Sequence, residues 1–498
     1  MQNFIFIFFA VYTAILFLIT WFTSRKATNE TYFTGNRRSP WFVVAYGMIG
    51  ASLSGVTFMS VPGDVANTQF TYFSVVIGYV LGYLAIAYIL LPLYYRLNLV
   101  SIYQYLGERF DMVAQKTGGL LFIVSRLTGS ALRMYLVIFV LQIFIFDSWG
   151  IPLWGTALFM IIIIFLYTFK AGIKTVVWTD MLQTTFLLVA LVISIYIIFR
   201  DMHIGVGDVF QLLQDNQYTQ IFNLDWRAGN FYWKQILGGM FITITMTGLD
   251  QDMMQKNLTC KNLKEAQKNM MSFSGTLVFV NALFLILGGL LLVFANQQGI
   301  DLTQIIAQKQ TDRIFPMIAL NHLGLVAAGF FVIGLISAGY SSADGTFAAI
   351  TTSFCYDIID MNRWTKTEQQ RTRIRRWTHV GMSLIFLTII LIFSRFHNDS
   401  LIRIIFMVAG YTYGPILGLF AFGMFSNRSI RNQWIIPTLS ILTPVIVFFI
   451  SKYSTYLFDG YKFGFELIIL NGALMMLFLF LCSTRKNKNP QQNVILTN

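Results

Sequence analysis

Long apolar stretches alternate with short polar ones along almost the whole chain. We count 13 apolar runs long enough for a helix to cross the hydrocarbon core of a bilayer, which is about 30 Å thick. The runs cover residues 3–22, 41–63, 71–95, 118–147, 152–171, 178–200, 233–249, 269–296, 317–355, 377–395, 401–424, 434–451 and 463–482. They lack the strict apolar–polar alternation of membrane β-barrel strands. The pattern predicts an all-α integral membrane protein with about 13 transmembrane helices.

The composition agrees with this prediction. Hydrophobic residues make up 56% of the 498 residues and charged residues only 11%, whereas soluble domains carry about 25% charged residues. No basic residue precedes the first run, and Arg25 and Lys26 follow it, so we expect no cleaved signal and an N-terminus outside. This orientation places 24 lysines and arginines in cytoplasmic segments and 8 in outside segments. We therefore expect a multi-pass protein of the cell (plasma or inner) membrane with a cytoplasmic C-terminus.

The positive-inside bias also explains the net charge of +13. It requires no nucleic-acid surface, and we expect no nucleic-acid partner. The basic cluster Arg371–Arg376 either anchors the following helix or contacts anionic lipid headgroups. The sequence has no G-x-x-x-x-G-K-[ST] phosphate loop, and its four histidines and three cysteines lack catalytic or metal-binding spacing. These observations argue against an enzyme.

The ninth run turns polar in its middle. Ser337, Tyr340, Ser341 and Ser342 supply four hydroxyls there, and Asp344 supplies a carboxylate. A carboxylate at the bilayer centre costs about 2.5–3.5 kcal/mol on insertion scales and calls for a partner. Small hard cations take such oxygen ligands. The stretch favours an ion or substrate path, although serines at this depth also serve close helix packing.

Two runs mix glycine with hydroxyl residues at mid-membrane, one at 47–57 and the other at 238–248. They lie five spans apart and therefore run in opposite directions. Interrupted segments in corresponding positions of two inverted halves are typical of a transporter binding site, where unwound backbone exposes carbonyls. The alternative is that these small residues pack helices together. Two such segments at this spacing favour the transporter.

Several stretches resemble one family of transporters. They are Tyr32–Trp41, Leu53–Gly63, Gln251–Lys256, Gly414–Phe420 and, as the most specific of them, Ala171–Gln183 with its Trp178-Thr179-Asp180. Together, in this order and at this spacing, they resemble the sodium:solute symporter family over about residues 30–425.

The resemblance implies the LeuT-type fold, an inverted repeat of five plus five helices whose first and sixth core helices are broken. The chain is then a single transmembrane domain, expected to function as a monomer. Residues 41–200 form the first repeat and residues 233–424 the second, inverted one. Residues 1–22 and 434–482 are peripheral helices, and residues 483–498 are a cytoplasmic tail.

The resemblance also implies a set of sodium ligands. By position, these are the carbonyls of Gly50, Leu53 and Ala338 and the hydroxyls of Ser341 and Ser342. Five oxygens around one small cation are chemically reasonable, since hard cations take oxygen ligands.

A second cation position is implied near Asp180, because in some members of the family this carboxylate helps to hold a second sodium. Those members keep serines where this chain has Asp344 and Gly345. Asp344 lies three residues after Ser341, on the same helix face. We interpret Asp344 as a charged ligand of a second cation or as a protonatable group. The alternative is that it caps a water-filled cytoplasmic exit.

The solute is less sharply defined by the sequence. Candidate solute-binding residues in the central cavity of this fold are Ser54, Thr57, Arg133, Thr243, Thr245 and Tyr411. Arg126 and Arg133 are seven residues apart and share a helix face. They can bind a carboxylate in bidentate fashion, and they can equally snorkel or pair with Asp180 or Asp344.

We therefore expect a symporter that imports a small polar organic solute by alternating access, driven by sodium. The solute is a sugar, a polyol or a molecule that bears a carboxylate. The alternatives are a sodium-coupled transporter of an inorganic or small organic anion, and a channel-like or sensor protein of the same fold. The expected partners are Na⁺, the solute and membrane lipid.

Overall fold

The computed structural model describes residues 2–25, 27–170, 172–363, 367–395 and 401–485. The predicted tail therefore lies outside the described residues from Lys486 onward. A helix is found in every predicted apolar run. These helices are α1 (Gln2–Ser24), α3 (Trp41–Ser52) with α4 (Gly55–Thr68), α5 (Tyr72–Ala85) with α6 (Leu91–Arg96), α8 (Met112–Leu141), α9 (Leu153–Thr168), α10 (Ile173–Met202), α12 (Tyr232–Thr243), α14 (Leu263–Gln297), α17 (Gly324–Ser353), α18 (Glu368–Phe393), α19 (Leu401–Phe425), α20 (Ile435–Lys452) and α22 (Leu467–Leu481).

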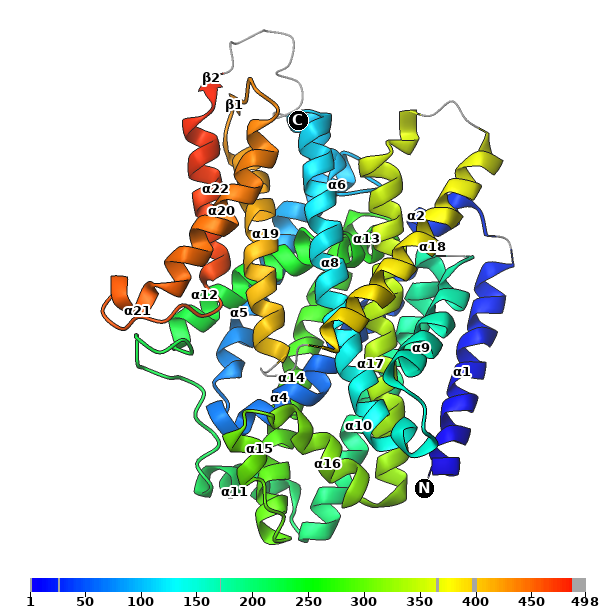
Figure 1. Ribbon diagram of the computed structural model, residues 1–498, viewed down its shortest axis with the longest axis vertical. Helices are drawn as coiled ribbons and strands as arrows, with labels where there is room; N and C mark the ends of the chain where they lie inside the picture. The colour runs from blue at the N-terminus through cyan, green and yellow to red at the C-terminus, as the bar shows by residue number, and fades with distance from the viewer. Residues whose placement is uncertain (1, 26, 171, 364–366, 396–400, 486–498) are drawn as a thin grey trace.

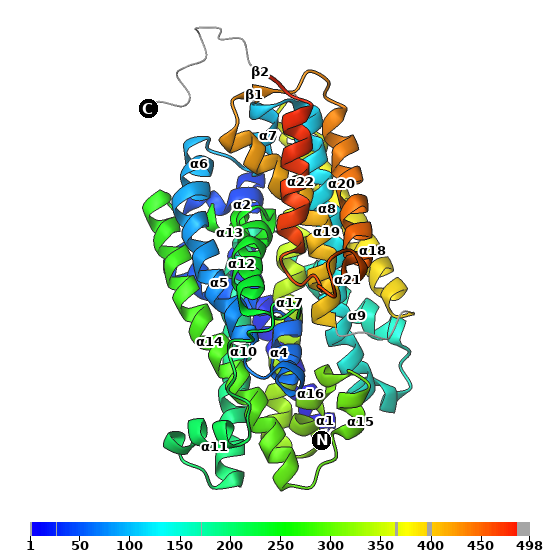
Figure 2. The ribbon, with the colours of Figure 1, turned by 90° about the vertical axis from the view of Figure 1, so that its left-hand side faces the viewer.

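Short elements connect these helices, some at the ends of the bundle and others within it or on its flank (Figures 1 and 2). They include α2 (Asn29–Thr34), α7 (Gln104–Arg109), α11 (Val209–Asp215), α13 (Gln251–Asn257), α15 (Thr303–Ala307), α16 (Ile314–Asn321) and α21 (Ser454–Leu457). Strand β1 (Arg428–Ser429) pairs in antiparallel fashion with β2 (Thr484–Arg485). In the described part of the chain, eight helices are long and apolar enough to cross a membrane, and nine if α3 and α4 form one bent span. The exact number of crossings stays a prediction.

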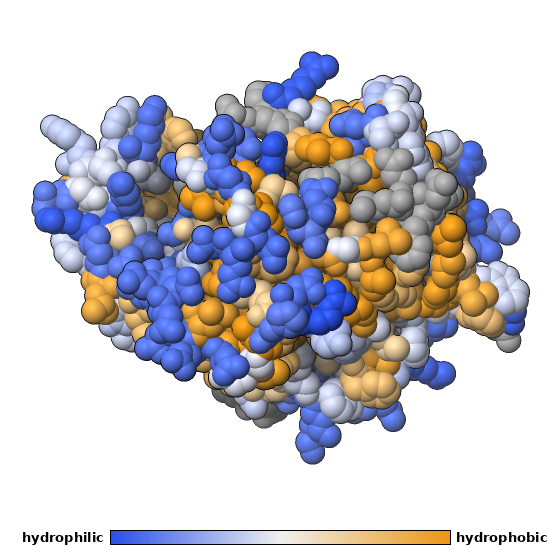
Figure 3. All heavy atoms as spheres, turned by 90° about the horizontal axis from the view of Figure 1, so that it is seen from below, coloured by the Kyte–Doolittle hydropathy of each residue, from blue (hydrophilic) through white to orange (hydrophobic). Residues whose placement is uncertain are grey.

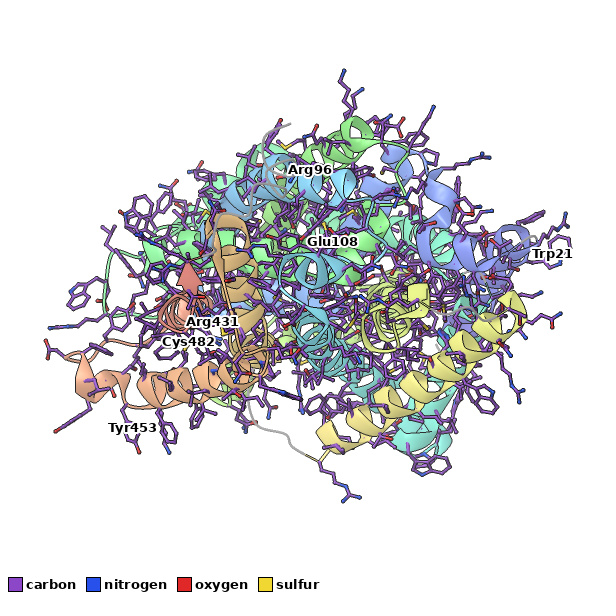
Figure 4. All side chains as sticks on the ribbon, turned by 90° about the horizontal axis from the view of Figure 1, so that it is seen from above. Trp21, Arg96, Glu108, Arg431, Tyr453 and Cys482 are labelled. Atoms are coloured by element: carbon purple, nitrogen blue, oxygen red, sulfur yellow. The ribbon has the colours of Figure 1, made fainter. Side chains whose placement is uncertain are left out.

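The centre of the bundle is formed by α8, α10 and α17 (Figure 1). Helix α10 packs against both α17 and α3, and α17 also packs against α8. Helix α1 lies on one flank, whereas α20 and α22 lie on the other. Viewed from the end that carries β1 and β2, Trp21 on α1 and Tyr453 beyond α20 mark opposite edges of the molecule (Figure 4).

The opposite end face, which carries α11 and α15, is rich in hydrophilic residues, with apolar side chains between and around them (Figure 3). Apolar side chains also remain exposed along the flanks of the bundle, among them Leu18 on α1, Ile162 on α9 and Ile441 on α20. Exposed apolar flanks between polar ends suit a protein that is surrounded by lipid.

The first predicted break is confirmed. The pair α3 and α4 bends by 52°, and Leu53 at the bend has a non-helical ψ of 70°. The last backbone bond of α3 runs from the N–H of Leu53 to Ile49, and the first of α4 from Phe58 to Ser54. A Cβ at Gly50 would lie 2.4 Å from the hydroxyl oxygen of Thr184, so glycine there lets α3 approach α10.

The second interruption occupies the end of the predicted stretch 238–248 and the two residues after it. Helix α12 continues through Gly238 and Gly239, and a π-helical turn follows at Ile244–Gly248. The chain leaves the helix only at Leu249 and Asp250, before α13. Both glycines serve close packing, because a Cβ would lie 2.6 Å from Phe465 at position 238 and 2.3 Å from the Val75 carbonyl at position 239. The packing interpretation is therefore correct for these two residues.

Candidate functional site

The residues of the implied sodium site lie on two helices that touch. Gly50 and Leu53 lie at the broken end of α3, and Ala338, Ser341 and Ser342 lie on α17, which packs against it. The three α17 residues are fully buried. The carbonyls of Gly50 and Leu53 lie between the last backbone bond of α3 and the first of α4. An all-oxygen donor set at a helix break fits sodium as the transported ion.

The two serine hydroxyls face different neighbours. Ser341 donates a hydrogen bond of 2.6 Å to Asp180 Oδ1 on α10. The hydroxyl of Ser342 lies 3.4 Å from that of Ser130 on α8, and Ser130 donates to the Ser342 carbonyl over 2.8 Å. The implied site therefore lies between α8 and α10. Asp180 contacts it through the hydrogen bond from Ser341.

Asp180 has a partner that the sequence did not predict. Lys256, on α13, lies with its Nζ 2.8 Å from Asp180 Oδ2 and 3.4 Å from Asp252 Oδ1. Lys256 and Asp180 are each 1% exposed. The signal was present in the sequence as two acids and one lysine within Asp250–Lys256, between apolar runs, but the sequence does not say where that turn packs.

Arg126 pairs with this turn, so the alternative that it pairs with Asp180 or Asp344 is wrong. Its guanidinium contacts Asp252 directly and lies 3.5 Å from Asp250. Tyr413 on α19 donates a hydrogen bond of 2.5 Å to Asp250. The buried charges thus alternate in sign from Asp180 through Lys256, Asp252 and Arg126 to Asp250. Alternation of this kind is how charges are tolerated at membrane depth.

Asp344 is held by neutral donors. Its Oδ2 accepts hydrogen bonds from Tyr167 (2.9 Å), Gln183 (3.2 Å) and Thr179 (3.4 Å). Its Oδ1 accepts one of 2.6 Å from the N–H of Gly345. In the described part of the chain no hydrogen bond joins Asp344 to Asp180. Asp344 is fully buried and has four hydrogen-bond donors around it. These contacts do not favour the interpretation that it caps a water-filled cytoplasmic exit.

Gly345 has a role of its own. A Cβ at this position would lie 2.3 Å from Asp252 Oδ1. Glycine therefore lets the charged turn of α13 approach α17, which a serine would obstruct.

A cavity of about 90 Å³ lies beside the break between α3 and α4. This volume is well above the ~10–15 Å³ that one water molecule requires. Of the predicted solute-binding residues, Ser54, Thr57, Arg133 and Thr243 line it. Sequence reasoning missed several other lining residues with polar groups, namely Ser52, Tyr72, Tyr79, Tyr83, Thr247 and Asn281.

Two predicted solute-binding residues do not line this cavity. The hydroxyl of Thr245 donates to the carbonyl of Phe241 over 2.8 Å, within its own helix. Tyr411 packs against Phe448 of α20, with ring centroids 6.1 Å apart. Thr243 and Thr247, four residues apart, line the cavity from one face of the segment that carries Thr245, and Thr245 between them faces another way.

Arg133 differs from Arg126 in its partners. Both line the cavity, but in the described part of the chain Arg133 forms no ion pair, whereas Arg126 has two. The guanidinium of Arg133 is therefore available to an anionic group that enters the cavity.

Comparisons with known proteins show the family of this chain. The model of the sodium:solute symporter family matches residues 32–433. The chain belongs to the sodium:solute symporter family. It is 27% identical over 455 residues to the sodium/sialic acid symporter NanT of Aliivibrio fischeri, covering 88% of this chain and 86% of the relative. It is 24% identical to the sodium/sialic acid symporter SiaT of Proteus mirabilis, covering 90% and 89%.

The fold of this symporter is also that of a solved relative. A substrate-bound, outward-open Na⁺-coupled sialic acid symporter, described as revealing a novel Na⁺-site, superposes with a TM-score of 0.82. It is 20% identical, with 97% of this chain and 99% of that chain covered. The protein is thus a multi-pass membrane transporter with a LeuT-like fold, and not an enzyme. It couples sodium to the movement of a small organic solute.

Replacing Asp344 by asparagine is expected to lower the thermal stability of the purified symporter. An amide cannot accept from all four donors around this position, and hydrogen bonds to charged groups contribute about 1.5–3 kcal/mol each. We expect the same loss with and without sodium, measured as the shift in unfolding temperature. The exposed Asp301→Asn is the matched control. A loss that grows when sodium is added would instead identify Asp344 as a ligand.

Proposed function

We propose that the symporter imports a small polar solute that bears a carboxylate, of the acidic-sugar class, across the cell membrane. The observation that carries this proposal is Arg133, a cavity-lining arginine without an ion pair in the described part of the chain. A guanidinium binds a carboxylate through two parallel hydrogen bonds. Hydroxyls from Ser54, Thr57 and Thr243 suit the remaining polar groups of a sugar.

Two further observations support the acidic-sugar class. The relatives NanT and SiaT are sodium/sialic acid symporters, and they match nearly the full chain. The cavity also carries the tyrosines Tyr72, Tyr79 and Tyr83, whose rings pack against the apolar faces of a sugar ring and whose hydroxyls bind its polar edge. We place the N-terminus outside and the C-terminus in the cytoplasm, because lysines and arginines concentrate in the segments that would be cytoplasmic.

Leu53 belongs to both the solute cavity and the implied sodium site. It lines the solute cavity, and its carbonyl belongs to the implied sodium site at the end of α3. A sodium ion that binds Gly50 and Leu53 fixes the broken end of α3 against α17. The solute then meets an ordered wall, so sodium binding raises the affinity for solute, and the solute raises the affinity for sodium by the same factor.

Thermal-shift measurements test this proposal. We expect N-acetylneuraminate to raise the unfolding temperature of the purified symporter in sodium and to have little effect in potassium, because a ligand stabilises only when it binds the folded state. N-acetylmannosamine, which lacks the carboxylate, serves as the matched control. Equal stabilisation by both sugars would contradict the role of the carboxylate. Stabilisation by neither would contradict the acidic-sugar class.

A further inference from the structure

The ammonium group of Lys256 contacts Asp180, the carboxylate that the family resemblance implies as a ligand of a second sodium. Such a cation would use Asp180 and oxygens near Ser341. Asp180 Oδ2 instead has Lys256 Nζ at 2.8 Å, and its Oδ1 accepts the Ser341 hydroxyl at 2.6 Å. Both carboxylate oxygens are therefore engaged, one by a positive charge that belongs to the protein. A sodium ion bound to Asp180 would therefore lie next to the ammonium of Lys256.

We infer that Lys256 is a tethered counter-cation that takes the place of a second sodium, so that one sodium is transported per solute. The inference rests on the sodium coupling of the proposed function and adds its stoichiometry. This stoichiometry depends on contacts between Lys256 and its neighbours and is the same for any solute that the central cavity accepts.

Charge and burial support this assignment. A second cation beside Asp180 would share one small, dry volume with the ammonium of Lys256, and like charges repel strongly where water is excluded. Lys256 also cannot swing away at low cost, because it is 1% exposed and bridges Asp180 to Asp252, four residues earlier on the same helix. Gly345 makes room for that bridge, since a side chain there would collide with Asp252.

Asp344 does not restore the second site. Its two oxygens accept four hydrogen bonds from neutral groups of α9, α10 and α17. A cation that bound Asp344 through Oδ2 would have to displace hydrogen-bond donors from it, and it would still lack Asp180. The first site is different, because its predicted ligands include the free carbonyls at the end of α3 and the hydroxyl of Ser342, which Lys256 does not contact.

Direct counting of bound sodium tests the inference. Full-length symporter in lipid nanodiscs is titrated with radioactive sodium in a scintillation proximity assay, without solute, beside the variants Lys256→Gln and Lys256→Arg. We expect about one sodium per protein for the natural sequence and for Lys256→Arg, which keeps the positive charge. We expect about two for Lys256→Gln, where the amide leaves Asp180 without a counter-charge and a cation can enter.

Each of the sodium counts can overturn the inference. Two sodium ions bound by the natural sequence would overturn the inference, and this outcome does not depend on how well any variant folds. One sodium bound by a folded Lys256→Gln would overturn it as well, because the vacated place would then not be a cation site. Since no solute is present, failure of this experiment is distinct from failure of the acidic-sugar proposal, which the thermal-shift comparison tests.

Discussion

Uptake of a carboxylate-bearing sugar by the Arg133→Gln variant is expected to fall by about two orders of magnitude at low solute concentration. Removing one partner of a buried, hydrogen-bonded charge pair costs about 2–5 kcal/mol, and each ~1.4 kcal/mol is a factor of ten in affinity. Arg133 reaches the central cavity from α8 without an ion pair in the described part of the chain. The loss should therefore appear in solute affinity and leave the binding of sodium alone unchanged.

The measurement is sodium-driven uptake of labelled N-acetylneuraminate into proteoliposomes. Arg200→Gln is the matched control, since Arg200 is exposed and pairs only with the neighbouring Asp201 in the described residues. Exposed pairs of this kind contribute about 0–1 kcal/mol. Arg133→Lys should retain part of the activity, because an ammonium keeps the charge but lacks the planar fork. Full uptake by Arg133→Gln would show that Arg133 does not bind the solute.

Removal of both serine hydroxyls from the sodium site is expected to have a comparably large effect. In Ser341→Ala/Ser342→Ala the ion loses its two side-chain ligands and keeps only backbone carbonyls. With about 1.5–3 kcal/mol for each interaction that involves a charge, we expect the sodium concentration for half-maximal uptake to rise at least a hundredfold. Ser337→Ala, one helical turn away and equally buried, should leave it unchanged.

Each single serine variant should give part of this effect, measured as the sodium dependence of uptake at saturating solute. Ser341→Ala carries a second consequence, because Ser341 also donates to Asp180. A double variant with the natural sodium dependence would show that sodium binds elsewhere.

Most of the fold could be predicted from the sequence, because a run of about 20 apolar residues has no stable state in a bilayer except a helix. The break at Leu53 was also predictable, since Gly50, Ser52, Ser54 and Gly55 disfavour a continuous helix. The second interruption is confined to the end of its predicted stretch, for a reason that the sequence does not reveal. Gly238 and Gly239 lie within a regular helix, where the lack of a side chain lets Phe465 and Val75 approach closely.

The charge network could not be predicted in detail. Asp180 and Lys256 lie on different helices, and only the packing of α13 against α10 and α17 brings them together. The sequence offered Asp180 or Asp344 as possible partners of Arg126, whereas its actual partners depend on where the turn at Asp250–Lys256 lies. Helical periodicity placed Ser341 and Asp344 on one helix face correctly. It could not predict that Tyr167 and Gln183 donate hydrogen bonds to the Asp344 carboxylate.

The contact between Lys256 and Asp180 has a consequence for the energetics of accumulation. If one Na⁺ enters with one monovalent anion, the cycle moves no net charge. A membrane potential of about 150 mV, worth about 3.5 kcal/mol for each charge moved, then contributes nothing to uptake. A tenfold sodium gradient supports a concentration ratio of about ten for the solute, equivalent to about 1.4 kcal/mol. Because the second positive charge belongs to Lys256 and is not transported, solute accumulation would depend on the sodium gradient and would not depend on the membrane potential.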